Sequence, residues 1–585
     1  MGGVGAGPGR SGTVEAELGR IAARSQEDDV TAKGAPSFIA EHSAAYLRDG
    51  LWQNRTIGTE FKVTAKRHAS RTALVSADGR WTYRELDELS DAFATGVLLL
   101  TDLRPGDPVI FQMGNIAETV VSYYGAVKAG LIPLCTLPQH GEHEVMSLAR
   151  HVEARGHLIQ ADHRTQDLPA LARRTAANVS IITTTIVARA EPDAGWVSYS
   201  GLLEAGRRRT TRSDVPAEDA SAVAVLQLSG GTTGLPKVAP RRHQEYLYNA
   251  RAWAHALGIG PESVVMHPLP LLHNAGIGAA MQPAHFSGAT FVLAPDAAPT
   301  TIATWTARER VTVVPVVPPA VAIRMLGDPA CDEADFSSLE WFLLAGQRPP
   351  VDLFDRLESQ LGIRAGQMFG MAEGMFLYTP KSSSDWARRH TIGTPVSPAD
   401  EIRVLAVGGD SEVADGDLGE LCCRGPYTIP GYFNAPEHNA ATFTHDGFFR
   451  TGDLVSRHIV DGCAYYSIDG RIKDVINRGG EKIHADGVEE MILKHPSVRN
   501  VSVVAMPDPV LGERVCAFVV VEPAAKPPTV DELGRFLLRL GLSKFKLPER
   551  VETLAEFPLT NLGKVSKKEL RLLIEKKLSE EIGTA

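Results

Sequence analysis

The sequence predicts an α/β protein with more than one domain. Between about residues 81 and 302, apolar strand-like runs such as residues 108–111 and 290–293 alternate with amphipathic stretches such as residues 118–128. This alternation is typical of parallel sheets covered by helices. The chain has 585 residues, of which 44% are hydrophobic. That length exceeds what one hydrophobic core usually supports, so two or more domains are expected.

The second half of the chain changes its pattern twice. From residue 405 to residue 466, short apolar runs are separated by Gly and Asp turns, as in residues 414–420. Further on, residues 489–495 and 529–540 are predicted to be helices, and residues 501–505 and 515–521 to be strands. These last elements suffice for a small α+β domain of about a hundred residues.

Charge and hydropathy exclude several classes of partner. The formal net charge is −10 and no block of basic residues occurs, so no nucleic acid or anionic lipid is expected to bind. The longest apolar runs, such as residues 311–317 and 501–506, are too short to cross a membrane. Residues 1–34 are rich in Gly, Ala, Ser and charge and contain no signal core, which predicts a flexible tail on a cytoplasmic protein.

The cysteines point to a reducing compartment. They form no C-x-x-C pair and no cluster at metal-ligand spacing, so we expect all of them to be buried thiols. They are Cys135, Cys331, Cys422, Cys423, Cys463 and Cys516.

Residues 229–237, with the sequence SGGTTGLPK, carry the strongest functional signal. Their glycines let backbone N–H groups turn inward, their hydroxyls add donors, and Lys237 adds a compact positive charge. Such a loop can bind a polyphosphate. It is not a Walker A loop, because Pro236 precedes the lysine and no Ser or Thr follows it. Taken alone, the segment is also consistent with an ordinary flexible loop.

Five further segments follow this loop in order. They are PLPLLHN at residues 268–274, QMFGMAEG at 367–374, FRTGDL at 449–454, GRIKD at 470–474 and PLTNLGKV at 558–565. Together with the loop they resemble the motifs of the adenylate-forming superfamily, which contains acyl-CoA synthetases, luciferases and the adenylation domains of nonribosomal peptide synthesis. The resemblance implies activation of a carboxylic acid as its acyl-AMP with release of pyrophosphate, and ATP and Mg²⁺ as cofactors.

The resemblance also implies the domain organisation. Residues 405–466 correspond to the β-rich subdomain of the family, and Lys473 occupies its hinge position. We therefore expect a flexible tail over residues 1–34, a large adenylation domain over residues 35–472 and a small mobile lid domain over residues 473–585. Gly479 and Gly480 are expected to line the approach of a thiol in a second half-reaction.

Adenylation brings a carboxylate against the α-phosphate of ATP, so the site must supply cations and oriented donors. The resemblance implies that Lys564, Glu373 and Thr233 are catalytic, with Glu373 as the Mg²⁺ ligand. Asp453 suits the ribose, because one carboxylate can accept from both hydroxyls. Taken singly, Lys564 is favoured by local composition to be a surface lysine, and Asp453 is equally consistent with a turn residue. The implied ATP-binding set is Ser229, Gly230, Gly231, Thr232, Thr233, Gly234, Lys237, Gly346, Met371, Ala372, Asp453 and Arg471.

The acid-binding motifs most resemble those of the aryl acid–AMP ligases, which activate 2,3-dihydroxybenzoate or salicylate. The resemblance assigns Asn274 to the ortho hydroxyl of the ring, although an Asn at this point can also cap the next element. His273 is expected to pack and gate, because a carboxylic acid needs no base at neutral pH. The implied substrate-binding set is His273, Asn274, Ala275, Gly346, Met368, Gly370 and Phe376.

Two departures from that branch alter the predicted pocket. After Asn274 the chain reads AGIGAAM, where the family has an aromatic and then a polar stretch. On the opposite wall, Met368 and Phe376 stand where the family usually has smaller aliphatic residues. Compared with the family, one wall of the pocket has less side-chain volume and the opposite wall has more apolar volume. We expect an aromatic or heteroaromatic acid with an ortho hydroxyl, amine or ring nitrogen; 2,3-dihydroxybenzoate and hydroxypicolinic, anthranilic or quinoline-type acids all remain open.

The acyl acceptor is expected to be a separate protein. The sequence ends soon after Lys564, so we expect an aryl or peptidyl carrier protein with a phosphopantetheine thiol, in siderophore or antibiotic (nonribosomal peptide) biosynthesis. An aryl- or acyl-CoA synthetase that uses coenzyme A is the alternative. A non-catalytic binding protein on this scaffold is a third reading, which predicts loss of Lys564, Glu373 or Asp453. All three residues are present.

Overall fold

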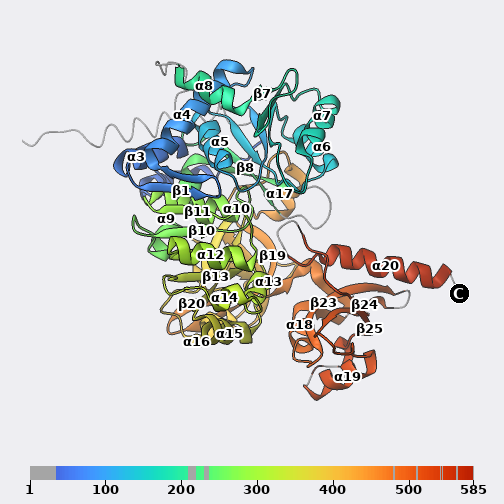
Figure 1. The fold of residues 1–585 in the computed structure, drawn as a ribbon. Coiled ribbons are helices and arrows are strands. Elements are labelled where there is room, and N and C mark those ends of the chain that lie inside the picture. The colour runs from blue at the N-terminus through green and yellow to red at the C-terminus, as the bar shows by residue number, and fades with distance from the viewer. Residues whose placement is uncertain are drawn as a thin grey trace, which may run out of the picture.

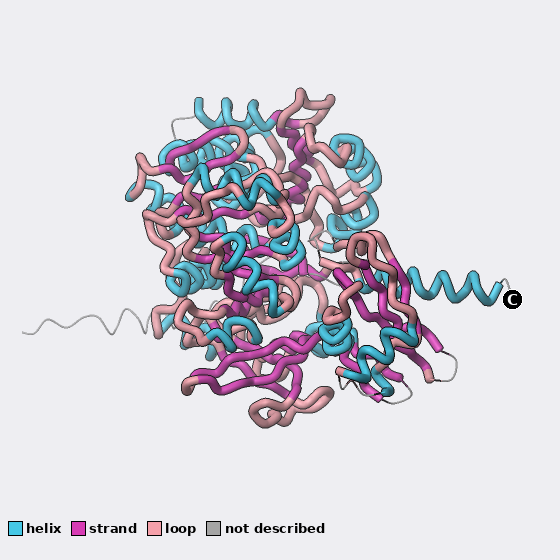
Figure 2. The backbone as a smooth tube through the Cα atoms, turned by 60° about the horizontal axis from the view of Figure 1, so that its bottom comes forward, coloured by secondary structure: helices cyan, strands magenta, loops and turns pink. Residues whose placement is uncertain are grey.

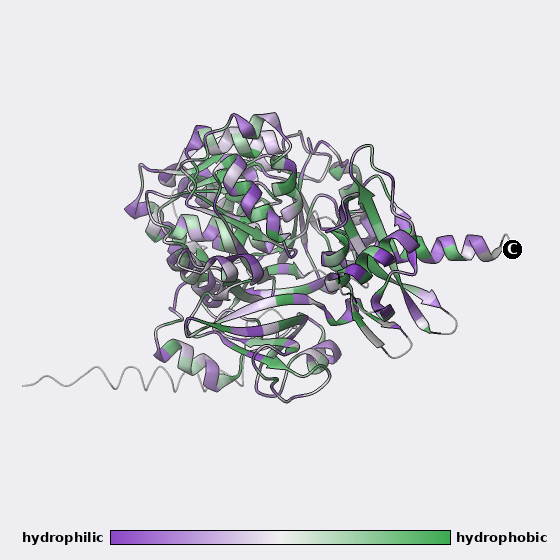
Figure 3. Ribbon diagram, turned by 90° about the horizontal axis from the view of Figure 1, so that it is seen from below, coloured by the Kyte–Doolittle hydropathy of each residue, from purple (hydrophilic) through white to green (hydrophobic). Residues whose placement is uncertain are grey.

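The computed structural model describes residues 34–208, 219–229, 236–478, 481–508, 511–540, 542, 544–560 and 564–583. These residues form four β-sheets with helices packed on the sheet faces (Figure 1, Figure 2), which confirms the predicted α/β architecture. The strands are mostly hydrophobic, whereas polar residues gather on the outer helices and loops (Figure 3). Among the described residues, no helix has both the length and the hydropathy that a membrane span requires.

One large sheet is parallel except at the edge strand β9, which runs antiparallel to β8. In spatial order its strands are β7 (Val197–Ser198), β6 (Thr184–Ala188), β5 (Gly156–Gln160), β3 (Pro108–Gln112), β4 (Ile132–Cys135), β8 (Val223–Ser229) and β9 (Lys237–Arg242). Its helices are α4 (Tyr83–Leu100), α5 (Ala117–Lys128), α6 (Glu142–His151), α7 (Leu168–Asn178) and α8 (Tyr199–Arg208). Helix α4 begins at a capping box of Thr82 and Glu85.

The second large sheet is parallel in its centre and antiparallel at both edges. Its spatial order is β16 (Thr394–Pro395), β15 (Gly374–Tyr378), β14 (Ala365–Met371), β13 (Trp341–Ala345), β12 (Val313–Val317), β10 (Val264–His267), β11 (Thr290–Leu293), β1 (Thr72–Ser76) and β2 (Gly79–Thr82). Strand β12 is VVPVV and buried throughout, as a parallel strand covered on both faces should be.

The remaining helices before the third sheet include α9, which ends at Gly258 in a left-handed conformation (φ 67°). The set is α2 (Ala40–Arg48), α3 (Ile57–Arg67), α9 (His243–Leu257), α10 (Asn274–Gly276), the π-helical turn η1 (Ile277–Met281), α11 (Gln282–Phe286), α12 (Pro299–Glu309), α13 (Pro319–Met325), α14 (Pro329–Asp332), α15 (Val351–Leu361) and α16 (Asp385–His390).

A third sheet is antiparallel and confirms the predicted β-rich segment. Its strands are β17 (Glu401–Leu405), β18 (Leu418–Arg424), β19 (Phe449–Val460) and β20 (Cys463–Arg471), and α17 (Pro436–Thr442) precedes β19. Cys463 is exposed, so its predicted burial is wrong, whereas the other five cysteines are buried. The cause is its place directly after the hairpin turn at Asp461 and Gly462, which both have positive φ.

The last sheet belongs to the C-terminal lobe at the lower right of Figure 1. Its order is β22 (Glu481–His484), β21 (Val475–Arg478), β24 (Gly512–Val521) and β23 (Val498–Asp508), with β25 (Arg550–Thr553) parallel to β24. The helices are η2 (Ile472–Asp474), α18 (Ala485–Ile492), α19 (Val530–Arg539), η3 (Lys544–Lys546) and α20 (Lys567–Gly583). The helix predicted at 489–495 thus begins earlier and ends at Ile492. The chain continues in i→i+3 turns as far as His495, where the following Pro496 disfavours helical backbone.

The largest core cluster lies between the two large sheets. It combines residues of both sheets, such as Phe111 and Phe291, with residues of α9, such as Trp253. Because β10, β12, β13 and β14 are mutually parallel, their carboxyl ends meet at one edge of the sheet. The chain leaves β13 at Gly346 and β10 shortly before His273, so predicted site residues gather at this edge.

Candidate active site

The loop predicted to bind phosphate connects β8 and β9. Its described ends, Ser229 and Lys237, are partners in the antiparallel strand pair. The intervening candidates Gly230, Gly231, Thr232, Thr233 and Gly234 lie outside the described residues. Lys237 Nζ lies 2.6 Å from His438 Nε2 and 5.0 Å from the centre of the Tyr432 ring. Desolvation lowers the pKa of Lys237, so its cation is partly enclosed at the foot of the loop.

Glu373 lies beside this loop, in the turn between β14 and β15. It is 5% exposed, and its Oε1 accepts hydrogen bonds of 2.5 Å from Ser229 Oγ and from the Tyr432 hydroxyl. Within the described ranges, no group of three His, Cys, Asp or Glu side chains forms a metal site by itself. Mg²⁺ does not need such a group, because it usually takes one or two carboxylates together with substrate phosphates. A single buried carboxylate beside this loop fits that requirement.

Asp453 and Arg471 form the next charged pair. They are cross-strand partners on β19 and β20, and Arg471 Nε donates to Asp453 Oδ1 over 2.7 Å. Asp453 is 2% exposed, and desolvation raises the pKa of its carboxyl against the opposing effect of Arg471. The structure therefore brings together Asp453 and Arg471, two members of the predicted ATP-binding set.

Lys564 reaches this site from the C-terminal lobe. Its side chain crosses Gly346, because a Cβ atom on Gly346 would lie 2.9 Å from Lys564 Cε. Gly346 has φ +89°, a backbone conformation that favours glycine, and the absence of a Cβ atom leaves room for the lysine side chain. Desolvation lowers the pKa of Lys564 to about 8, and the charge of Arg471 adds to this effect. Lys564 is therefore not the free surface lysine that its local sequence alone suggests.

His273 caps the short helix α10 at the same edge. Its Nδ1 accepts from the backbone N–H of Ala275 over 3.2 Å. Desolvation lowers the pKa of His273 to about 3, and Lys564 contributes to the shift, so the imidazole is neutral near pH 7. The cap of this helix is His273, and the neighbouring Asn274 directs its side chain to other partners.

Asn274 is buried, with 3% of its surface exposed. Its Oδ1 accepts from the Tyr246 hydroxyl over 2.7 Å and from Arg241 over 3.3 Å. Its Nδ2 donates to the carbonyl oxygen of Met371 over 3.0 Å. The next carbonyl oxygen, of Ala372, accepts from Arg241 over 3.0 Å. Asn274 is thus tied to the same segment that carries Glu373.

The predicted opposite wall is formed by the paired strands β14 and β15. Gly370 stands opposite Phe376, and a Cβ on Gly370 would lie 2.8 Å from the Phe376 ring and 2.9 Å from Met368 Cε. Gly370 is exposed, whereas Phe376 is 1% exposed and packs edge-on against Trp253 and Tyr427. The two residues predicted for this wall, Met368 and Phe376, therefore lie next to Gly370, and Phe376 packs against Trp253 and Tyr427.

Sequence reasoning missed several residues that hold the site. Arg241, Tyr246, Tyr432 and His438 were assigned no role, because they lie outside the motifs or at their margins. The spacing of Arg241 and Glu245, four residues apart, is the one signal that points to an ion pair. Conversely, the predicted thiol-approach residues Gly479 and Gly480 lie outside the part of the chain that the structure describes.

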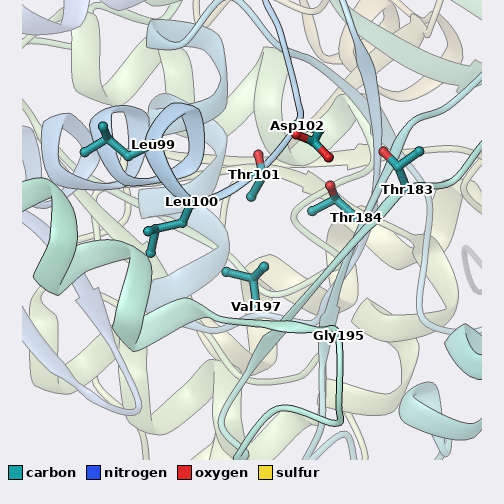
Figure 4. Close-up of a pocket in the computed structure, with 8 residues that line it drawn as sticks. All are labelled: Leu99, Leu100, Thr101, Asp102, Thr183, Thr184, Gly195 and Val197. Atoms are coloured by element: carbon teal, nitrogen blue, oxygen red, sulfur yellow. The ribbon is translucent and has the colours of Figure 1, made fainter.

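A shallow pocket of about 310 Å³ lies away from this site, between the end of α4 and the start of β6 (Figure 4). It has one carboxylate and no cationic side chain, so it does not suit a polyphosphate. Its lining residues are Leu99, Leu100, Thr101, Asp102, Thr183, Thr184, Gly195 and Val197.

Comparison with known proteins agrees with this arrangement. The family model described as "AMP-binding enzyme" matches residues 61–433, and that of the "AMP-binding enzyme C-terminal domain" matches residues 487–564. Pyochelin synthase PchD of Pseudomonas aeruginosa is 38% identical over 550 residues, covering 93% of this chain and 97% of its own. The 2,3-dihydroxybenzoate-AMP ligase of Bacillus subtilis is 36% identical over 548 residues, covering 93% and 98%.

A solved structure gives the same result. The apo structure of MbtA from Mycobacterium smegmatis has a TM-score of 0.70 and 34% identity, over 92% of this chain and 98% of that one. The chain therefore belongs to the AMP-binding family of adenylate-forming ligases. Within that family it is similar to the aryl acid–AMP ligases, the branch that its sequence motifs predict.

Proposed function

We propose that the protein activates an aromatic or heteroaromatic carboxylic acid as its acyl-AMP and transfers the acyl group to the phosphopantetheine thiol of a separate carrier protein. The relatives named for pyochelin synthesis and for 2,3-dihydroxybenzoate support a role in siderophore or antibiotic biosynthesis. The observation that carries the proposal is the buried Asn274 amide, which lies at the same sheet edge as Lys564 and is bonded to the segment that holds Glu373.

The charged residues have distinct roles in this reaction. Attack of the carboxylate on the α-phosphate builds negative charge, and Lys564 is placed to stabilise it together with Arg471. Asp453 accepts from the ribose hydroxyls, and Lys237 holds the outer phosphates. Glu373 would hold Mg²⁺, which would supply positive charge to neutralise the phosphates when bound. The leaving group is pyrophosphate.

The side-chain amide of Asn274 narrows the class of acids that we expect the site to bind. Both of its described Oδ1 contacts come from donors, and one Nδ2 hydrogen is taken by Met371. The other Nδ2 hydrogen has no acceptor among the described residues, so the group that Asn274 offers is an N–H donor. An acid with an acceptor atom ortho to the carboxylate, a hydroxyl oxygen or a ring nitrogen, satisfies it.

The direct test is a pyrophosphate-release screen over aryl, heteroaryl, aliphatic and amino acids, followed by transfer from the adenylate to either a loaded carrier protein or coenzyme A. We expect ortho-hydroxy and ortho-nitrogen aromatic acids to be turned over and the carrier thiol to be the better acceptor. Preference for aliphatic acids would refute the aryl reading. A better rate with coenzyme A would assign the chain to the CoA synthetases instead.

Asn274→Ala should shrink the preference for an ortho-substituted acid over its unsubstituted parent. The loss of one buried hydrogen bond corresponds to about 5-fold to 150-fold in discrimination. The measurement is kcat/KM for 2-hydroxybenzoate and benzoate in both proteins. Phe376→Val, which opens the other wall, should widen acceptance of bulkier rings while leaving the ortho preference in place. An unchanged preference in Asn274→Ala would remove Asn274 from substrate recognition.

The pKa of Lys564 predicts an alkaline limb in the pH profile. The active form is the protonated one, and its pKa in the free site is lowered to about 8. Raising the pH through 8 therefore removes the charge, and kcat/KM for the acid should fall by about tenfold per pH unit. Lys564→Arg should be less active but lack this limb, because a guanidinium stays charged. A wild-type profile that is flat well above pH 8 would contradict this assignment.

A further inference from the structure

An ion pair is buried next to Asn274, the residue that we propose contacts the acid. Arg241 is the penultimate residue of β9 and is 0% exposed, and Glu245, in the first turn of α9, is 1% exposed. Arg241 Nε donates to Glu245 Oε1 and Nη2 to Glu245 Oε2, each over 2.9 Å. A fully buried charge is unfavourable unless it is paired and hydrogen-bonded, and this bidentate geometry meets both conditions.

The remaining donors of Arg241 reach the walls of the site. Nη1 donates to Asn274 Oδ1 over 3.3 Å and to the carbonyl oxygen of Ala372 over 3.0 Å. Nη2 donates to the carbonyl oxygen of Tyr427 over 3.2 Å. The guanidinium also stacks on the Tyr246 ring, 4.2 Å from its centre. Because a guanidinium keeps its charge and has no acceptor atom, Arg241 can only donate to Asn274.

These contacts leave one orientation open to the Asn274 amide. Its Oδ1 faces two donors, Arg241 and the Tyr246 hydroxyl, while its Nδ2 faces the carbonyl oxygen of Met371. A flipped amide would set N–H against the Arg241 guanidinium and a carbonyl oxygen against the carbonyl oxygen of Met371, so both of these contacts would become repulsive. The Tyr246 hydroxyl, which can donate or accept, would lose its present donation to Asn274. The orientation is thus set by chemistry that does not depend on the substrate.

We propose that Arg241, fixed by Glu245 and stacked on Tyr246, is a specificity-determining positioning residue. It holds the Asn274 amide so that this side chain offers its N–H and not its carbonyl oxygen to the acid, and it thereby selects acids with an ortho acceptor against acids with an ortho donor. This inference rests on the proposed function, since it concerns how the same pocket distinguishes acids. The sequence does not distinguish an ortho hydroxyl or ring nitrogen from an ortho amine. This inference predicts that the pocket prefers the hydroxyl and the ring nitrogen.

The chemistry of the ortho group explains the selection. A phenolic hydroxyl can direct its hydrogen to the neighbouring carboxylate and keep a lone pair for Asn274, and a pyridine-type nitrogen has a lone pair in the ring plane. The nitrogen lone pair of an aromatic amine is delocalised into the ring, so the amine presents mainly N–H groups. Beside the fixed N–H of Asn274, an amine leaves a buried donor unpaired.

The test uses ratios of kcat/KM for pyrophosphate release with 2-hydroxybenzoate, pyridine-2-carboxylate and 2-aminobenzoate. Such ratios are independent of the fraction of active protein, so a merely structural role of Arg241 does not move them. We expect the wild type to favour the two acceptor acids over 2-aminobenzoate by at least about fivefold. Tyr246→Phe, which keeps the stacking ring and removes one donor to Oδ1, should reduce that ratio by about twofold to tenfold.

A double variant addresses Arg241 itself. Arg241→Gln combined with Glu245→Gln removes both charges, leaves no unpaired ion and replaces the obligate donor by an amide that can flip. The ratio should fall further than in Tyr246→Phe. If the double variant does not fold, as judged by its thermal unfolding, Tyr246→Phe decides alone. Tyr248→Phe is the matched control, since its hydroxyl contacts Ser397 instead, and its ratio should equal the wild-type ratio.

The outcomes separate this inference from the proposed function. Equal kcat/KM for 2-hydroxybenzoate and 2-aminobenzoate in the wild type would overturn the inference, as would a ratio that Tyr246→Phe leaves unchanged. In both cases aryl acid adenylation would stand. Failure of every aromatic acid to release pyrophosphate would overturn the proposed function itself.

Discussion

Lys564→Ala is expected to abolish adenylate formation while leaving the fold and the affinity for ATP nearly intact. The lysine charge acts on the negative charge that builds in the transition state, so its removal should lower kcat by at least about 100-fold, the usual scale for one such contact. The small residual activity should come from Arg471 and the phosphate loop. Pyrophosphate exchange measures the first half-reaction, and calorimetric titration with ATP measures the affinity.

Lys568→Ala is the matched control for this change. It removes a lysine four residues further on that is exposed and lies at the start of α20, away from Asp453 and Gly346. Its pyrophosphate exchange should equal that of the wild type. Near-normal exchange in Lys564→Ala, or an equal loss in the two variants, would remove Lys564 from the mechanism.

Much of the fold is predictable because its signals are local. Runs such as residues 290–293 become strand β11 with the same bounds, and residues 529–540 become α19 with Thr529 as its capping residue. The errors are also local in origin. The helix predicted at 489–495 differs at both ends from α18, and Pro496 disfavours helical backbone at His495. Cys463 is exposed because it directly follows a hairpin turn.

The site is predictable only where a motif contains its residues. Glu373, Asp453 and Lys564 are named by their own segments, and the structure brings them to one edge of the sheet. The residues that hold these three in place cannot be predicted in this way. Arg241 contacts Asn274 and the carbonyl oxygen of Ala372, which lie 33 and 131 positions further along the chain. No local pattern encodes such contacts, because they exist only after both sheets have packed on α9.

Hydrogen bonds anchor the chain on either side of Lys473, the predicted hinge residue. Arg471 is tied to Asp453 in the β-rich part, while Asp474 accepts from Arg571 of α20 over 2.6 Å. Ile472 and Lys473 are the residues between these two anchors. We therefore propose that residues 473–585 move as one unit about this point, exchanging the face that carries Lys564 for another face.

Lys473→Pro is expected to retain adenylation and to lose thioester formation by at least about tenfold. Lys473 lies in the 3₁₀ turn η2, where φ is typically about −50° to −70°, and proline fixes φ near −65°. The substitution therefore locks the arrangement in which Lys564 crosses Gly346, which is the one suited to adenylation. Because proline also disfavours helical backbone at Ile472, a moderate fall in the thermal unfolding midpoint should accompany it.

The two half-reactions give the decisive comparison. Pyrophosphate release without acceptor measures adenylation, and transfer from preformed acyl-AMP to the carrier thiol measures the second step. Lys473→Ala removes the same side chain but leaves φ free, so both of its rates should change by the same small factor. An equal loss of both rates in Lys473→Pro would indicate general misfolding. A selective loss of adenylation would mean that the locked arrangement is the thiol-transfer one, and that Lys564 reaches its catalytic position only after the lid has turned.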